Sequence, residues 1–166
     1  MAAMLSRLAL AIALFATVSG PLQAMDWTRY VNARFGMGVD IPADFSVEGA
    51  AAVEGDGKRF RARNGRATIT AWGAPARDAD FMAETGARIA AEEAAGWAIT
   101  YRSETPDWAA WGGTRGGHVF YAKAILVCGG AQTANVRLDY PVADIRAFDS
   151  VVNRLGQSLG QDGACF

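Results

Sequence analysis

Alternating apolar and polar residues on both sides of Asn64-Gly65 give the clearest local prediction in the chain. If residues 58–73 turn at this dipeptide, Phe60 aligns with Ile69 on one face and Arg59 aligns with Thr70 on the other. An Asn-Gly pair favours a two-residue type I′ turn, because both central positions of that turn need φ > 0. The sequence therefore predicts a hairpin with one apolar face and one arginine face. The arginine face carries Arg59, Arg61, Arg63 and Arg66.

Strand-like periodicity continues through most of the remaining chain. Glycine and proline breaks separate the runs at intervals typical of antiparallel connections. The run at 117–128 has little polarity and is predicted to be a central strand. A loop is expected from Ser46 to Gly57. Besides the hairpin, strands are expected as a pair around Asn32 and at 97–103, 108–114, 117–128 and 133–140.

Two segments have the period of a helix instead. The first is expected to begin at the N-cap Asp78 and to end at Ala95, ahead of Gly96. It has a narrow apolar stripe formed by Phe81, Thr85 and Ile89. The second begins near Val142 and has a clear apolar face formed by Ile145, Phe148, Val152, Leu155 and Leu159. Clustered strands with only two helices predict an α+β fold, in which an antiparallel sheet is flanked by the two main helices.

The first 24 residues have the pattern of a secretory signal peptide. Arg7 precedes an apolar run of about a dozen residues, and Leu22-Gln23-Ala24 offers a cleavage site. The run is shorter than the roughly 20 residues of a membrane span. We therefore expect export to the periplasm, no stable membrane anchor after cleavage, and a single α+β domain over 25–166. An uncleaved N-terminal anchor is the alternative.

Export changes how the two cysteines are interpreted. An oxidising compartment favours a disulfide between Cys128 and Cys165, which would hold the C-terminal tail. Two free thiols are the alternative. Neither cysteine belongs to a Cys-x-x-Cys pair, so the sequence gives no support for a thiol oxidoreductase.

Charge and motifs limit the chemistry that the sequence supports. The formal net charge is −1, which gives no general case for binding nucleic acid. No compact set of ligands for a metal ion is present, and no cofactor motif is found. His118 is the only histidine and lies in no catalytic motif, so an enzyme that uses His118 or Asp139 near a tryptophan-lined pocket is an alternative without positive support.

Several short motifs, in order, resemble a known family. The chain is similar to small exported bacterial proteins of unassigned function that are related to the PsbP-like fold. The resemblance implies an antiparallel sheet flanked by helices and a role in binding or assembly without known catalysis. It carries over no functional residues. The motifs that support it are Tyr30-x-Asn32-x-x-Phe35-Gly36, residues 39–45, Gly55-Asp56-Gly57-x-x-Phe60, and residues 114–117 and 138–141.

The arginine face is the one functional hypothesis that has a geometry. Four guanidinium groups on one hairpin suit the recognition of carboxylate or phosphate groups. Strict alternation also places Trp72 on this face. The leading hypothesis is a non-catalytic binding protein for an unknown periplasmic protein or an anionic small molecule. The alternatives are a solvated face neutralised by acids such as Glu48 or Glu54, and a purely structural envelope protein.

Overall fold

The computed structural model describes residues 25–48, 56–77 and 80–165 of the chain. The expected signal peptide at 1–24, the expected N-cap Asp78 and the acid Glu54 lie outside these residues. Among the described residues, no helix is both long enough and apolar enough to cross a membrane.

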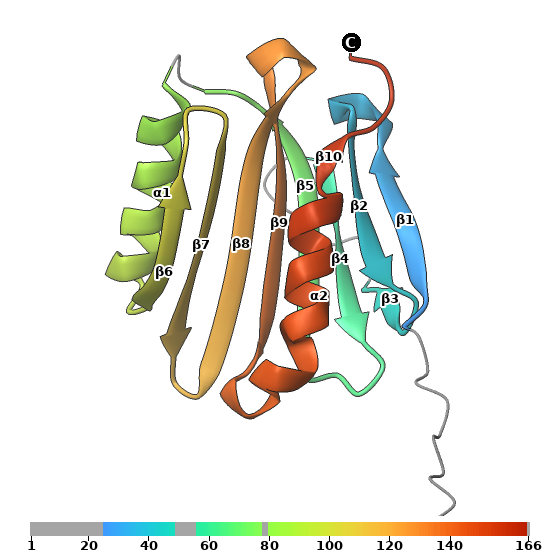
Figure 1. The fold of residues 1–166 in the computed structure, drawn as a ribbon, viewed down its shortest axis with the longest axis vertical. Helices are drawn as coiled ribbons and strands as arrows, with labels where there is room; N and C mark the ends of the chain where they lie inside the picture. The colour runs from blue at the N-terminus through green and yellow to red at the C-terminus, as the bar shows by residue number, and fades with distance from the viewer. Residues whose placement is uncertain (1–24, 49–55, 78–79, 166) are drawn as a thin grey trace, which may run out of the picture.

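An antiparallel sheet of seven strands forms the middle of the molecule (Figure 1). The strand order is β3-β4-β5-β9-β8-β7-β6, so β9 is the central strand and β8 lies beside it. This arrangement confirms the predicted α+β class with an antiparallel sheet and two main helices. The strands are β3 (Phe45–Val47), β4 (Asp56–Ala62), β5 (Thr68–Pro75), β6 (Ala98–Glu104), β7 (Trp108–Arg115), β8 (His118–Val127) and β9 (Gln132–Pro141).

A second, three-stranded sheet lies beside the first. It consists of β1 (Trp27–Asn32), β2 (Met37–Pro42) and β10 (Gly160–Gln161), with β2 in the centre. The predicted pair of strands around Asn32 is therefore confirmed, and a short 3-10 helix, Ala33–Phe35, connects them. The addition of β10 was not predicted, because two residues leave no periodic pattern in the sequence.

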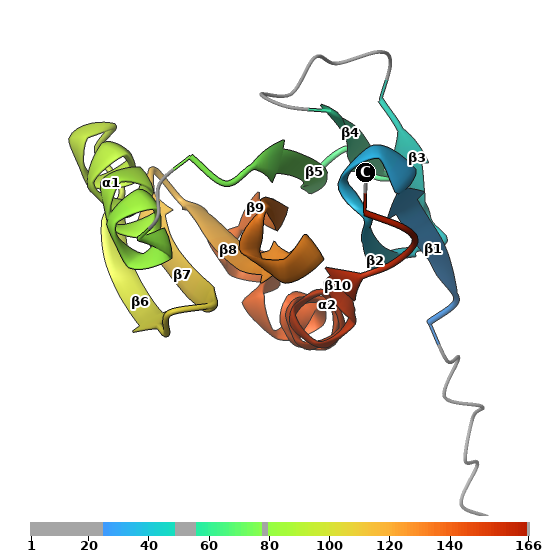
Figure 2. The ribbon, with the colours of Figure 1, turned by 90° about the horizontal axis from the view of Figure 1, so that it is seen from above.

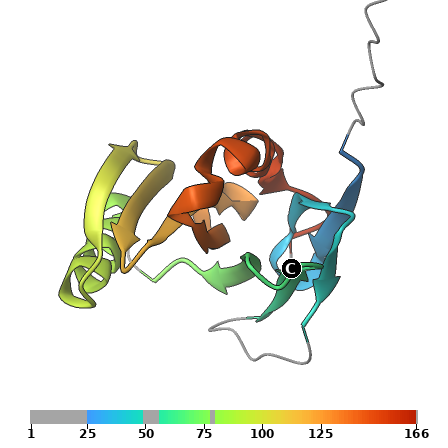
Figure 3. The same ribbon diagram turned by 90° about the horizontal axis from the view of Figure 1, so that it is seen from below.

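The two faces of the large sheet are covered by different elements. Helix α1 (Phe81–Ala94) packs against β6 and β7 on one face, which we call the α1 face. Helix α2 (Ile145–Ser158) and the small sheet cover β9, β8 and β5 on the opposite face, which we call the α2 face. Figures 2 and 3 show the two helices on opposite sides of the sheet and at different positions along it.

Each face has its own apolar core. The larger core lies between the α2 face, α2 and the small sheet, and it includes Met37, Ile69, Leu138 and Leu155. The smaller core lies under α1 and includes Phe81, Ile89, Trp97 and Phe120. Because α1 packs mainly against β6 and β7, no described helix lies over β4 on the α1 face (Figure 2).

Helix α1 begins two residues later than predicted. The side chain of Asp80 accepts hydrogen bonds from the amides of Met82 (3.0 Å) and Ala83 (3.2 Å), so Asp80 is the N-cap. The predicted stop is confirmed, since Gly96 follows the helix with φ of 88°. The predicted stripe of Phe81, Thr85 and Ile89 is buried.

Helix α2 differs in part from its predicted apolar face. Val142 belongs to a single 3-10 turn, Val142–Asp144, and the helix proper begins at Ile145. Ile145, the first residue of the helix, is 40% exposed and so does not belong to the buried face. Leu155 and Leu159 are buried as predicted, together with Val151, which the prediction missed.

The β4–β5 hairpin has the predicted register but not the predicted turn. Arg59 pairs with Thr70 and Phe60 with Ile69, which confirms the alignment. Gly65 has φ of 72°, whereas no described non-glycine residue except Cys128 has positive φ, so the type I′ turn is wrong. The chain instead forms a longer loop, in which the Gly65 amide donates to Ala62 O (2.7 Å) and the Asn64 side chain accepts from the Arg66 amide (3.0 Å). This loop spares Asn64 the strain of the left-handed region.

The loop expected from Ser46 to Gly57 needs correction at its start. Ser46 and Val47 belong to strand β3 rather than to a loop, because Phe45–Val47 pairs with Phe60–Ala62. Gly112-Gly113 lies inside β7, where a Cβ on Gly113 would be 2.6 Å from Ala98 O. Gly116-Gly117 forms a tight connection between β7 and β8, with φ of 54° and 79°.

The expected disulfide is present. Cys128 follows β8, Cys165 lies in the tail after β10, and their Cα atoms are 5.4 Å apart. The tail is also held by the Asp162 amide, which donates to Gly36 O (2.7 Å), and by an ion pair between Asp162 and Arg29 (2.8 Å). The C-terminal tail is therefore fixed to the edge of the small sheet.

Candidate functional site

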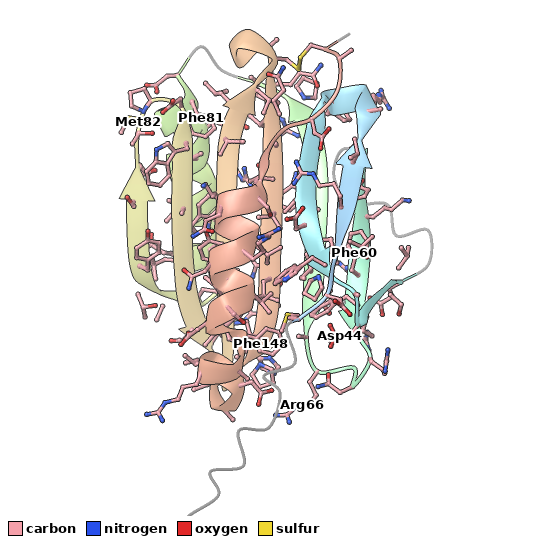
Figure 4. All side chains as sticks on the ribbon, turned by 45° about the vertical axis from the view of Figure 1, so that its right-hand side comes forward. Asp44, Phe60, Arg66, Phe81, Met82 and Phe148 are labelled. Atoms are coloured by element: carbon pink, nitrogen blue, oxygen red, sulfur yellow. A yellow bond between two sulfur atoms is a disulfide. The ribbon has the colours of Figure 1, made fainter. Side chains whose placement is uncertain are left out.

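The four arginines of the hairpin do not form a single cluster. Arg59 and Arg61 alternate with Phe60 along β4 and lie exposed on the α1 face, as predicted. Arg63 and Arg66 lie in the loop, also exposed. Arg66 pairs with Asp144 (3.1 Å), just before α2, at the same end of the molecule as Phe148 (Figure 4).

Nearby acids neutralise half of this set. Arg61 Nε lies 2.8 Å from Glu48 Oε1, which is one of the two acids that the sequence analysis considered. Arg66 has Asp144. Within the described ranges, Arg59 and Arg63 form no ion pair, so these two are the unpaired members of the set of four arginines.

Trp72 lies on the same face, two residues beyond Thr70, as strict alternation predicted. Gly57 pairs with Trp72 across the hairpin, where a Cβ would lie 2.4 Å from Trp72 Cβ. The indole is half-buried and lines a hollow between β5, β9 and α1. Sequence position alone could not show that the wall opposite Trp72 is a helix.

This hollow, which we call the Arg88 cleft, consists of two adjoining parts. The wider part has a volume of about 570 Å³ and the narrower part about 230 Å³. Both parts are lined by Trp72, Arg88 and Ala91. Trp111 and Arg137 line the narrower part, and Arg77 and Glu84 line the wider part.

Arg88 extends from α1 over two aromatic rings. Its guanidinium carbon lies 5.4 Å from the centre of the Trp72 ring and 5.0 Å from that of Trp111. Its Nη1 donates to Asn135 Oδ1 (2.6 Å), a neutral acceptor on β9. Burial lowers the pKa of Arg88, and this effect outweighs the nearby charges of Glu84 and Glu92.

Arg137 lies next to Arg88 but is fully paired. It forms two hydrogen bonds to the Asp139 carboxylate (2.8 and 2.9 Å) and a third to Glu92 on α1. Burial alone would lower its pKa, but the hydrogen bonds and charges of Asp139 and Glu92 outweigh burial and raise the pKa. Arg137 therefore joins α1 to the sheet and has little capacity left for a ligand.

His118 and Asp139 come together in a third hollow, of about 350 Å³, which Trp97 and Arg115 also line. His118 is exposed at the start of β8, and both carboxylate oxygens of Asp139 accept from Arg137. The described residues hold no group of three or more His, Cys, Asp or Glu side chains that could bind a metal ion. The arrangement offers no nucleophile with an adjacent base.

The α2 face carries a separate hollow of about 540 Å³ between α2, β7 and β8. Lys123 Nζ donates to Gly156 O (2.6 Å) and lies 5.6 Å from the Trp108 ring. Burial lowers the pKa of Lys123. Burial and the charge of Tyr101 raise the pKa of Tyr121 to about 12, so its phenol is protonated at neutral pH. Lys123 is thus engaged with the end of α2.

Solved structures with the same fold are known, although their sequences are very different. PsbP from the cyanobacterium Synechocystis matches with a TM-score of 0.64 at 10% identity, over 86% of this chain and 96% of that one. The Ran-binding protein Mog1p of Saccharomyces cerevisiae matches with a TM-score of 0.61 at 7% identity, over 84% and 97%. A Mog1 mutant matches with a TM-score of 0.60 at 7% identity, over 84% and 98%.

The chain has the PsbP and Mog1 fold. This finding confirms the fold that the sequence resemblance implied. No protein-family model matches the sequence, and no curated protein matches it. At these identities the likeness concerns the fold alone, so the residues of the site have to be argued from their own chemistry.

Sequence reasoning missed Arg88, Asn135 and Arg137. Each has an ordinary local explanation, as a helix surface residue or a strand residue. One usable signal was the spacing of Arg88 and Glu92, which lie four residues apart and therefore on one side of α1. The other was the alternation of Asn135, Arg137 and Asp139, which puts three polar side chains on one face of an otherwise apolar strand.

Proposed function

We propose that this protein is a non-catalytic periplasmic binding protein, which recognises an acidic surface of a partner protein through Arg59 and Arg63 of the β4–β5 hairpin. The observation that carries the proposal is the unequal pairing of the hairpin arginines. Arg61 and Arg66 have carboxylate partners, whereas Arg59 and Arg63 are exposed without one among the described residues. Two guanidinium groups without an ion pair, on one hairpin of the sheet, suit carboxylate recognition.

The shape of the molecule supports the same surface. No described helix covers the sheet beside Arg59 on the α1 face, so a partner can approach this face of the sheet at β4 (Figure 2). A protein with this fold, Mog1p, is described as Ran-binding, which shows that the fold can serve protein recognition. Export to the periplasm rests on the N-terminal sequence pattern.

A pull-down from native extract tests the proposal. We expect the tagged wild-type protein to retain a partner at low salt and to lose it as salt rises, because the contacts are charged. Arg59→Glu and Arg63→Glu should each weaken retention about tenfold, since they place a carboxylate against an acidic surface. Arg146→Glu, which makes the same charge change at an exposed site on α2, is the matched control and should retain the partner. Equal retention by all four proteins would contradict the proposal.

A further inference from the structure

Two arginines, Arg88 and Arg137, lie between α1 and the sheet, and they differ in their partners. Arg137 has two carboxylates, Asp139 and Glu92. Arg88 lies beside it, is half-buried, and among the described residues has no carboxylate within ion-pairing distance. Its one hydrogen-bond acceptor is the neutral amide of Asn135. A guanidinium group has five N–H donors, so most of the donors of Arg88 remain available.

A second group at the same place also lacks a partner. The residue Trp111 is only 2% exposed, and its indole nitrogen is buried without a hydrogen-bond acceptor among the described residues. A buried N–H without an acceptor is costly and uncommon in folded proteins. Trp111 lines the narrower part of the Arg88 cleft, directly under the Arg88 guanidinium. Arg88, which has donors to spare, and the ring of Trp111 therefore lie at one cavity.

We propose that the Arg88 cleft binds the carboxylate group of a small organic acid. The carboxylate accepts hydrogen bonds from the free edge of the Arg88 guanidinium, which lies over the Trp111 ring. The body of the acid lies in the wider part of the cleft, against Trp72 and the small apolar residues Pro75, Ala87 and Ala91. The site is distinct from the hairpin arginines, and its existence does not depend on the proposed protein partner.

Local charge favours a monoanion over a phosphate dianion. Glu84 and Glu92 line the two parts of the cleft, and a second negative charge on the ligand would be repelled by both. Glu92 is already paired with Arg137, and Glu84 accepts a hydrogen bond from the Arg77 amide (3.1 Å). One cation without an ion pair, flanked by aromatic rings, matches a single carboxylate on a planar or apolar body.

The test is a titration of the full mature chain, monitored by NMR of its indole N–H groups. Trp→Phe variants assign the Trp72 and Trp111 signals. The probes are acetate, benzoate and phenylacetate, each compared with its neutral amide. We expect at least one acid to give saturable shifts of the Trp111 signal below roughly 10 mM, with the matching amide giving none. If none of the acids saturates, or if amide and acid behave alike, the proposal is overturned.

Variants of Arg88 separate ligand binding from a purely structural role. Arg88→Met keeps most of the aliphatic stem and should weaken acid binding about tenfold or more, because it removes a charge-assisted hydrogen bond. Arg88→Lys should bind at an intermediate level, since it keeps the charge but loses the planar fork. Arg59→Glu, which changes the proposed partner surface, should leave acid binding unchanged. Unaltered binding by folded Arg88→Met and Arg88→Lys would overturn the proposal.

Discussion

Gly73→Ala is expected to destabilise the protein by about 3 kcal/mol or more, because it overpacks the junction between the two sheets. Gly73 lies in β5 opposite Ala134, and its Cα faces the ring of Phe35. A Cβ at Gly73 would lie 2.2 Å from Phe35 Cβ and 2.4 Å from Phe35 Cγ. Phe35 is only 6% exposed and lies among core residues, so it has no space to move away.

Urea unfolding measures this effect, and the chain offers a matched control. Gly86→Ala makes the same chemical change in the middle of α1, where the nearest atom to the new Cβ would be a side-chain nitrogen of Arg102 at 3.8 Å. It should stabilise the protein by about 0.5–1 kcal/mol through helix propensity. Phe35→Leu in the Gly73→Ala background should recover part of the loss. A Gly73→Ala protein as stable as wild type would contradict the packing described for this junction.

Removal of the disulfide is the second change with a large expected effect. The Cys128→Ser/Cys165→Ser double variant should lose about 4 kcal/mol of unfolding free energy in the chain-entropy model. The closed loop is long, since the two cysteines are 37 residues apart, and it encloses β9, α2 and β10. Reduction of the wild-type protein should have the same effect, which makes the reduced wild type a check on the variant.

The loss should be visible locally as well as globally. Without the bond, the described part of the tail is held by β10, by the Gln161 side chain, which accepts from the Cys128 amide (3.1 Å), and by the contacts of Asp162 with Gly36 and Arg29. Its amides should therefore exchange faster than those of β9. Equilibrium unfolding and hydrogen exchange measure the two effects. An unfolding free energy within about 1 kcal/mol of the oxidised protein would show that the tail contributes little to stability.

The elements predicted well from the sequence are those fixed by local contacts. The β4–β5 register followed from residues within a few positions of Asn64-Gly65, and the end of α1 followed from Gly96. The turn itself was predicted wrongly, because the alternatives differ by little energy and the choice depends on contacts elsewhere. One such contact is the Arg63 amide, which donates to Asp44 O (3.0 Å) in the connection before β3.

The candidate sites depended on pairings that a single sequence does not reveal. β5 pairs with β9, which places Trp72 opposite Asn135 although they are 63 residues apart. Arg88 reaches this pair only because α1 folds back over β7. Likewise, Arg66 differs from Arg59 and Arg63 because it pairs with Asp144. Asp144 lies beside the hairpin only after α2 has packed on the sheet.

The central claim is that partner recognition takes place on the α1 face at the hairpin, and site-specific photo-crosslinking in native extract tests it most directly. A photoreactive residue at Thr68, which lies on the α1 face opposite Arg61, should form a crosslink to a partner at low salt. The same residue at Asn153, exposed on α2 at the opposite face, should form none. A crosslink from Asn153 with none from Thr68 would contradict the claim, and so would the absence of a crosslink from either position.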